Sequence, residues 1–202
     1  NNSLTKTSLD KLSVGRGSFS ATRIGSYALF GGGRIVDGKI NNRTDSPIVD
    51  AYDESLTHTV ATPLALGGET VSASNQNYAI FFTSDKVTAY DSSLTRTIVS
   101  SIPNTLSPGT VARAGNYVVV AGKNTIYAYD MFLTLTSTVE PLATPRDDAG
   151  GVTLKDFAIF AGGIISRSSS TGINVSNAVD IYDPYLTRTE AEGISKSRAS
   201  IS

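Results

Sequence analysis

Cysteine and tryptophan are absent from the 202-residue sequence, and histidine occurs once, at His58. Without cysteine the chain has no disulfide, no thiolate metal ligand and no thiol nucleophile. With one histidine it has neither a histidine-based catalytic triad nor a metal site built from several imidazoles. These absences argue against an enzyme, and we expect neither a cofactor nor a bound metal.

Charged residues are also scarce. Asp, Glu, Lys and Arg make up 17% of the chain, against roughly a quarter in an ordinary domain, and the formal net charge is −1. Such a balance gives no general attraction to nucleic acid or to anionic lipid. Because no apolar run approaches the roughly 18 residues of a membrane span, we predict no nucleic-acid partner and no membrane insertion.

Serine and threonine are abundant instead, with 26 and 23 residues, and glycine contributes 18. Hydroxyl, β-branched and glycine residues suit strands and turns. No window shows the 3.6-residue apolar period of a helix. The chain is therefore predicted to be almost entirely β.

A segment of pattern D-x-x-L-T recurs along the chain at spacings of 38 to 53 residues, and a degenerate copy lies at the start. A Tyr-Asp segment precedes each of the four complete copies, and an aromatic-led run lies further upstream. An Asp that recurs just before a turn predicts capping of backbone amides, and a Tyr that recurs at one strand position predicts packing between repeats. The complete copies begin at Asp53, Asp91, Asp130 and Asp183, and their tyrosines are Tyr52, Tyr90, Tyr129 and Tyr182.

Each copy has the pattern of four short strands separated by turn residues. Such a sheet must stack on its neighbours to bury both faces, so the repeat predicts an all-β propeller of four-stranded antiparallel blades. Because the single strands at the two ends do not complete a blade, we expect a larger ring, completed by further sequence or by another chain. The predicted blades span about residues 16–60, 67–99, 108–138 and 146–192, with a leading strand at 3–10 and the start of a further blade at 196–202.

The repeat resembles the kelch family, in which an Arg opens the first strand, an aromatic strand ends in Gly-Gly, and a Tyr-Asp strand leads into a turn. Gly32-Gly33 and Gly162-Gly163 keep the double glycine, whereas the Trp usual in the fourth strand is absent. More narrowly, YALFGGG…VDAYDxSLTRT is similar to a kelch-like variant of surface and phage tail-associated proteins of gut bacteria. The resemblance implies a β-propeller and an extracellular, cell-surface or virion location.

Two of the four copies are longer because one connection is extended. From the aromatic of the second strand to the tyrosine of the third there are 25 residues in the first and fourth copies (Tyr27 to Tyr52, Phe157 to Tyr182), but only 12 in the other two. In a propeller these loops project from the face that carries the connections between blades. Loops on a rigid scaffold often carry binding groups.

Arginines mark the same two copies. Arg16 and Arg146 each precede the aromatic by eleven residues, and Arg198 occupies the matching place after the fourth copy. The kelch resemblance would put these three around the mouth of the central channel. The residues predicted to contact a ligand at this face are Arg16, Arg34, Lys39, Asn42, Arg43, Arg146, Arg167 and Arg198.

Two interpretations of these arginines remain open. Guanidinium groups pair well with carboxylate and sugar oxygens, which points to an anionic or hydroxyl-rich ligand. The alternative is structural, with Arg16 and Arg146 holding neighbouring strands through backbone carbonyls and through acids such as Asp147 and Asp148.

Other polar residues also have competing interpretations. The pairs Asp50–Asp53 and Asp180–Asp183 could support hydrolysis or bind Ca²⁺. The recurrence of Asp53 and Asp183 in every copy favours a scaffold role instead. His58 aligns with residues of differing chemistry, which predicts a solvent-facing strand position, and these residues are Lys6, Arg96, Leu135 and Arg188.

The sequence therefore favours a non-catalytic binding or adhesion module on a bacterial surface or phage virion, which recognises a glycan or a protein through its long-loop face. The alternative is a purely structural spacer or assembly domain that contacts other chains of a phage tail or cell-surface complex. An enzyme would need catalytic residues from outside these 202 residues.

Overall fold

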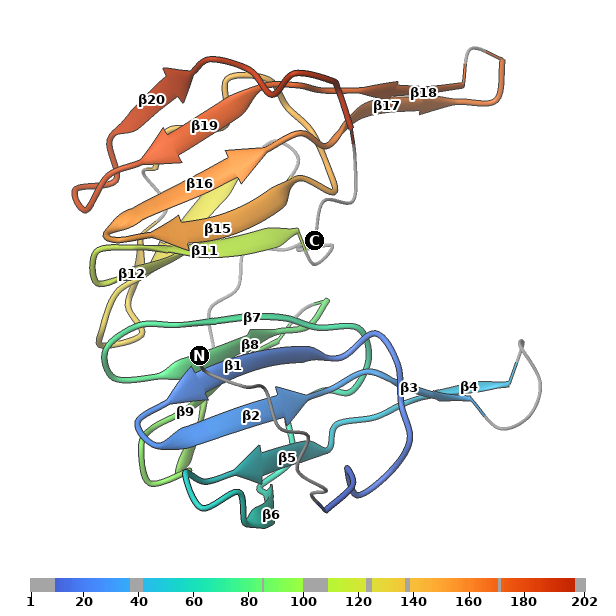
Figure 1. Cartoon of the computed structure of the whole chain (residues 1–202), viewed down its shortest axis with the longest axis vertical. Helices are drawn as coiled ribbons and strands as arrows, with labels where there is room; N and C mark the ends of the chain where they lie inside the picture. Colours follow the sequence, from blue (N-terminus) through green and yellow to red (C-terminus); the bar gives the residue numbers. More distant parts are fainter. Residues whose placement is uncertain are drawn as a thin grey trace, which may run out of the picture.

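The computed structural model describes residues 10–36, 42–84, 86–99, 109–122, 125–136, 139–170 and 172–198. This part of the chain forms twenty β-strands and no helix. Sixteen strands build four antiparallel four-stranded sheets, and the other four strands form two hairpins (Figure 1). The all-β prediction is confirmed.

Each sheet follows the chain from one strand to the next through short turns. Sheet 1 contains β1 (Ser20–Ile24), β2 (Tyr27–Gly31), β5 (Val49–Tyr52) and β6 (His58–Ala61). Sheet 2 contains β7 (Val71–Ser74), β8 (Ala79–Phe82), β9 (Val87–Tyr90) and β10 (Arg96–Val99). Sheet 3 contains β11 (Thr110–Ala114), β12 (Tyr117–Ala121), β13 (Ile126–Tyr129) and β14 (Leu135–Thr136). Sheet 4 contains β15 (Gly150–Leu154), β16 (Phe157–Ala161), β19 (Val179–Tyr182) and β20 (Arg188–Ala191).

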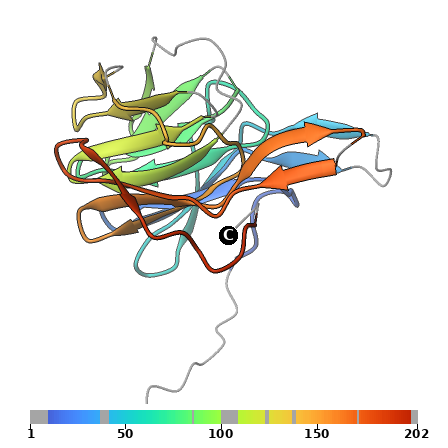
Figure 2. The same ribbon diagram turned by 90° about the horizontal axis from the view of Figure 1, so that it is seen from above.

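The two long connections predicted as loops are in fact β-hairpins. The first pairs β3 (Arg34–Val36) with β4 (Arg43–Asp45), between β2 and β5 of sheet 1. The second pairs β17 (Ile164–Ser168) with β18 (Gly172–Val175), between β16 and β19 of sheet 4. Both hairpins project in the same direction from the same edge of the molecule, as Figures 1 and 2 show. The single strands predicted at 3–10 and 196–202 lie mostly outside the described residues.

The core lies between successive sheets, in three apolar clusters. Period-2 alternation explains this, because neighbouring residues of one strand point to opposite faces. In sheet 2, Phe81 packs toward sheet 1, whereas Phe82 packs toward sheet 3. The tyrosines at the recurring strand position fill the same clusters, as predicted, and those without any exposed surface are Tyr90, Tyr129 and Tyr182. Burial raises the pKa of Tyr129 to about 12.

The first strands of the four sheets lie next to one another. β1 contacts β7, β7 contacts β11, and β11 contacts β15. They approach closely because their residues are small: a Cβ added at Gly151 would lie only 2.8 Å from the carbonyl oxygen of Val111. Ser20, Thr70 and Thr110 line a shared cavity of about 350 Å³ at this meeting point.

The recurring D-x-x-L-T turns close the opposite edge. In each turn, the Asp carboxylate accepts a hydrogen bond from the amide of the residue four positions later, at 2.8 to 2.9 Å, so the predicted capping role is confirmed. The Leu of each turn has a φ between 60° and 65°, which is costly for a residue with a Cβ. The leucine is kept because Leu94, Leu133 and Leu186 pack against the clusters between sheets.

We expect Leu94→Gly to lower the free energy of unfolding by about 1 kcal/mol, because about 2 kcal/mol of lost burial exceeds about 1 kcal/mol of relieved backbone strain. Leu56 is the matched control, since it has the same backbone conformation but is 46% exposed. Leu56→Gly should leave stability unchanged or raise it. Urea unfolding measures both variants, and equal losses would contradict the packing explanation.

Candidate functional site

The candidate site is the edge of the molecule that carries the two hairpins and the connections between sheets. The double glycine after β2 fixes the base of the first hairpin. Gly33 has a φ of 91°, and its amide donates to the carbonyl oxygen of Gly68 at 2.7 Å. The next amide, that of Arg34, donates to the carbonyl oxygen of Gly17 at 2.8 Å. The hairpin therefore leaves sheet 1 from a base that is hydrogen-bonded on both sides.

Arg16 is buried at this base and does not face solvent. Its Nη1 lies 2.7 Å from Oδ2 of Asp50, and neither side chain has any exposed surface. Its Nε and Nη2 donate to the carbonyl oxygens of Gly32 and Phe30, at 2.8 and 2.9 Å. The guanidinium thus joins the segment before β1 to strands β2 and β5.

Arg146 repeats this arrangement in sheet 4, at a constant offset of 130 residues from Arg16. It lies 2.8 Å from Asp180, both side chains are fully buried, and its Nη2 donates to the carbonyl oxygen of Phe160 at 3.1 Å. Neither Arg16 nor Arg146 is therefore placed to contact a ligand, and the geometry gives both a structural role. The acids that pair with them are Asp50 and Asp180, where the sequence pointed to acids such as Asp147 and Asp148.

Asp50 collects further donors. Its Oδ1 accepts from the amide of Ser13 at 3.0 Å and lies 2.6 Å from Nε2 of His58. Burial would raise the pKa of Asp50, but the hydrogen bonds from Ser13, His58 and Arg16 together lower it. The predicted solvent-facing position of His58 is wrong, because its side chain is only 16% exposed and contacts the buried carboxylate.

Sheet 4 uses an arginine where sheet 1 uses His58. Nη1 of Arg188 lies 3.0 Å from Oδ1 of Asp180, which also accepts from the amide of Ala143 at 3.0 Å. The same guanidinium reaches Glu140 at 2.7 Å, and hydrogen bonds to the neighbouring carboxylates raise the pKa of Arg188. The paired carboxylates considered for catalysis are thus divided, with Asp50 and Asp180 buried in ion pairs while their partners cap turns.

The arginines of the hairpins are more exposed, but carboxylates accompany them. Arg34 on β3 contacts Asp45 at 3.0 Å and Glu69 at 2.9 Å, and its side chain is 34% exposed. Arg167 on β17 forms an ion pair with Asp148. These pairs neutralise much of the positive charge predicted for this face, so an anionic ligand is disfavoured.

The remaining predicted residues have differing positions. Asn42 and Arg43 are exposed on the first hairpin, and Lys39 lies outside the described residues. Arg198 holds the base of the second hairpin through its main chain, because its carbonyl oxygen accepts from the amide of Gly163 at 2.7 Å. Its exposed side chain contacts only the carbonyl oxygen of Lys196, at 3.4 Å, among the described residues.

Apolar residues on the hairpins were missed from the sequence. Val36 on β3 is 54% exposed and Ile173 on β18 is 62% exposed. An exposed hairpin with β-branched residues offers side chains and strand edges to a partner. Across the described ranges, no group of three or more acidic or histidine side chains is arranged to hold a metal ion. The described residues also include no helix of the length and apolarity needed to cross a membrane.

Comparison with known proteins gives the fold and no function. No protein-family model matches the chain, and no curated protein matches it in sequence. Among solved structures, the one titled "Structure of YjhT" superimposes with a TM-score of 0.69 at 12% sequence identity. The match covers 92% of this chain and 72% of that chain. At this level of identity the likeness shows a similar fold only.

We expect Asp50→Asn to cost about 3 kcal/mol of stability at neutral pH, because it leaves the buried Arg16 guanidinium without its counter-charge. The lowered pKa means that the stabilising carboxylate is fully ionised above its ordinary value of 3.8 and is lost as pH falls through the lowered value. The stability difference between the two proteins should therefore shrink below about pH 4. Urea unfolding across pH measures it.

Asp45→Asn is the control for this substitution. It removes the partner of an exposed pair with Arg34, so it should cost less than about 1 kcal/mol at any pH. Equal losses for the two variants would contradict a special role for the buried pair.

Proposed function

We propose that the four sheets are consecutive blades of a kelch-like β-propeller that serves as a non-catalytic binding module. Two features support the propeller. The first strands of all four sheets line one cavity, as the inner strands of blades do around an axis. Each sheet also packs on the next one through equivalent positions, which gives the three clusters between sheets.

The two outer sheet faces support a larger ring. Ile24 of sheet 1 is 4% exposed because sheet 2 covers it, whereas its counterpart in sheet 4, Leu154, is 60% exposed. On the opposite face of sheet 1, Phe30 and Tyr52 line an apolar pocket of about 330 Å³. Their counterparts in sheet 2 are fully buried. The occupant that fits both faces is a further sheet of the same repeat, supplied by a longer chain.

We expect the 202-residue chain alone to self-associate in a concentration-dependent manner, because two complementary apolar faces are open. Val152→Asp with Leu154→Asp changes two residues that are 58% and 60% exposed, so it should abolish association without lowering the melting temperature. Sedimentation velocity measures the effect. A wild-type chain that stays monomeric at every concentration would count against the open ring.

The binding role rests on the two hairpins, which project in the same direction from sheets 1 and 4 (Figure 2). Their arginines are accompanied by carboxylates, and each hairpin exposes an apolar residue, Val36 or Ile173. Mixed charges beside apolar groups suit a protein surface better than an acidic glycan. We therefore favour a protein partner over a glycan, in the extracellular, cell-surface or virion setting that the sequence resemblance implies.

The alternative is a purely structural spacer or assembly domain, and the open sheet faces favour it. The two functions differ in what the hairpins do. A spacer needs only the sheet faces, whereas a binding module loses its partner when the exposed hairpin residues are changed.

Binding of the fluorescently labelled chain to gut bacterial cells tests the choice. We expect binding that falls at least tenfold for Val36→Ser with Ile173→Ser, disappears after protease treatment of the cells, and survives periodate oxidation of their sugars. Val60→Ser is the control, since Val60 is 52% exposed on β6 of sheet 1, away from the hairpins. Sensitivity to periodate alone would assign a glycan partner. Absence of binding, or equal binding by all variants, would favour the structural role.

A further inference from the structure

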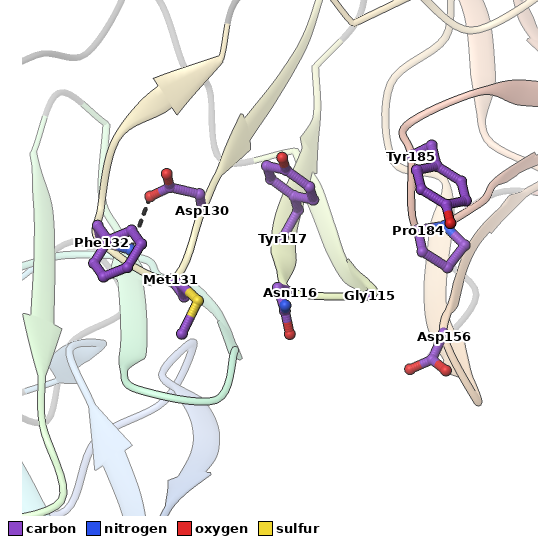
Figure 3. A pocket seen from close by; sticks show the side chains of 9 residues that line it. All are labelled: Gly115, Asn116, Tyr117, Asp130, Met131, Phe132, Asp156, Pro184 and Tyr185. Atoms are coloured by element: carbon purple, nitrogen blue, oxygen red, sulfur yellow. Dashed lines mark hydrogen bonds between the residues drawn. The ribbon is translucent and has the colours of Figure 1, made fainter.

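A groove of about 490 Å³ lies at the turn edge, opposite the hairpins. It is formed by four turns of sheets 3 and 4, those between β11 and β12, β13 and β14, β15 and β16, and β19 and β20. Figure 3 shows the side chains that line it, with Phe132 on one side and Tyr185 on the other. The groove shares no lining residue with the hairpin face.

The two aromatic side chains are the most exposed large apolar residues in the described part of the chain. Phe132 is 72% exposed and Tyr185 is 88% exposed. Both occupy the third position of the D-x-x-L-T turn, where sheets 1 and 2 have Ser55 and Ser93.

The turn does not require an aromatic residue at this position. The amides of Phe132, Tyr185 and Ser93 each donate to the Asp two residues earlier, and all three distances are 2.8 Å. Because a serine forms the same turn, folding does not explain two exposed aromatics. Binding does explain them, since aromatic side chains form contact surfaces of low conformational entropy.

Polar groups lie between the aromatics. Asn116 is exposed, and its side chain has no hydrogen-bond partner among the described residues. Asp156 is 63% exposed, with Nη1 of Arg113 at 3.4 Å. An amide supplies both donors and acceptors, and a carboxylate supplies acceptors. The lining contains no lysine or arginine.

We propose that this groove binds a neutral saccharide. A sugar ring has an apolar C–H face that packs on an aromatic ring, and hydroxyl groups that exchange hydrogen bonds with an amide and a carboxylate. The absence of a basic residue from the lining disfavours an acidic sugar. A basic ligand is also disfavoured, because Asp130 is engaged in capping its own turn and Asp156 has Arg113 beside it.

Saturation-transfer NMR with maltotriose, cellotriose, chitotriose and N-acetyllactosamine as probes tests the proposal. At least one probe should receive saturation from the wild-type chain. Phe132→Ser with Tyr185→Ser should abolish the transfer without lowering the melting temperature, because the chain itself uses serine at this turn position. Asn116→Ala should weaken binding about tenfold, as expected for one lost hydrogen bond.

The hairpin variant Val36→Ser with Ile173→Ser should bind the same probe as well as the wild-type chain does. The groove and the hairpin function can therefore fail independently. No transfer to any of the four probes, or transfer that persists in the double aromatic variant, overturns the proposal. Binding of a lysine-rich peptide in place of every sugar also overturns it and assigns the groove to basic ligands.

Discussion

The buried ion pairs Arg16–Asp50 and Arg146–Asp180 organise the two sheets that carry hairpins. A charged pair without solvent is tolerated only where further hydrogen bonds satisfy it. Each arginine therefore also holds carbonyl oxygens of the second strand, while each aspartate holds an amide of the segment before the first strand. Three segments of each sheet are joined at the point from which its hairpin leaves, so the hairpin projects from a rigid base.

The two edges of the molecule are built in different ways. At the connection edge, variation is in length, since two sheets carry hairpins and two have short connections. At the turn edge the length is constant, because the Asp cap and the Leu backbone conformation fix every turn. The two middle positions of each turn are free to vary. Sheets 3 and 4 use this freedom to expose Phe132 and Tyr185.

Much of the fold could be predicted from the sequence because it depends on local patterns. Alternation and turn residues indicate the strands, and recurrence identifies the capping Asp residues and the buried tyrosines. The hairpins were missed although Asp37-Gly38 is a typical hairpin turn signal after the β-branched pair Ile35-Val36. The error for His58 has another cause. Its counterpart positions suggested exposure, but only sheets 1 and 4 place a buried aspartate beside that position.

The sequence by itself determined the all-β class, the four repeats and the poverty in catalytic side chains, because composition and period are properties of the chain alone. Only the tertiary structure decided which polar residues are available to a partner. Arg16 and Arg34 are alike in sequence, yet one is fully buried against Asp50 while the other lies at the surface. Burial depends on contacts between residues far apart in the chain, and such contacts exist only once the sheets have packed.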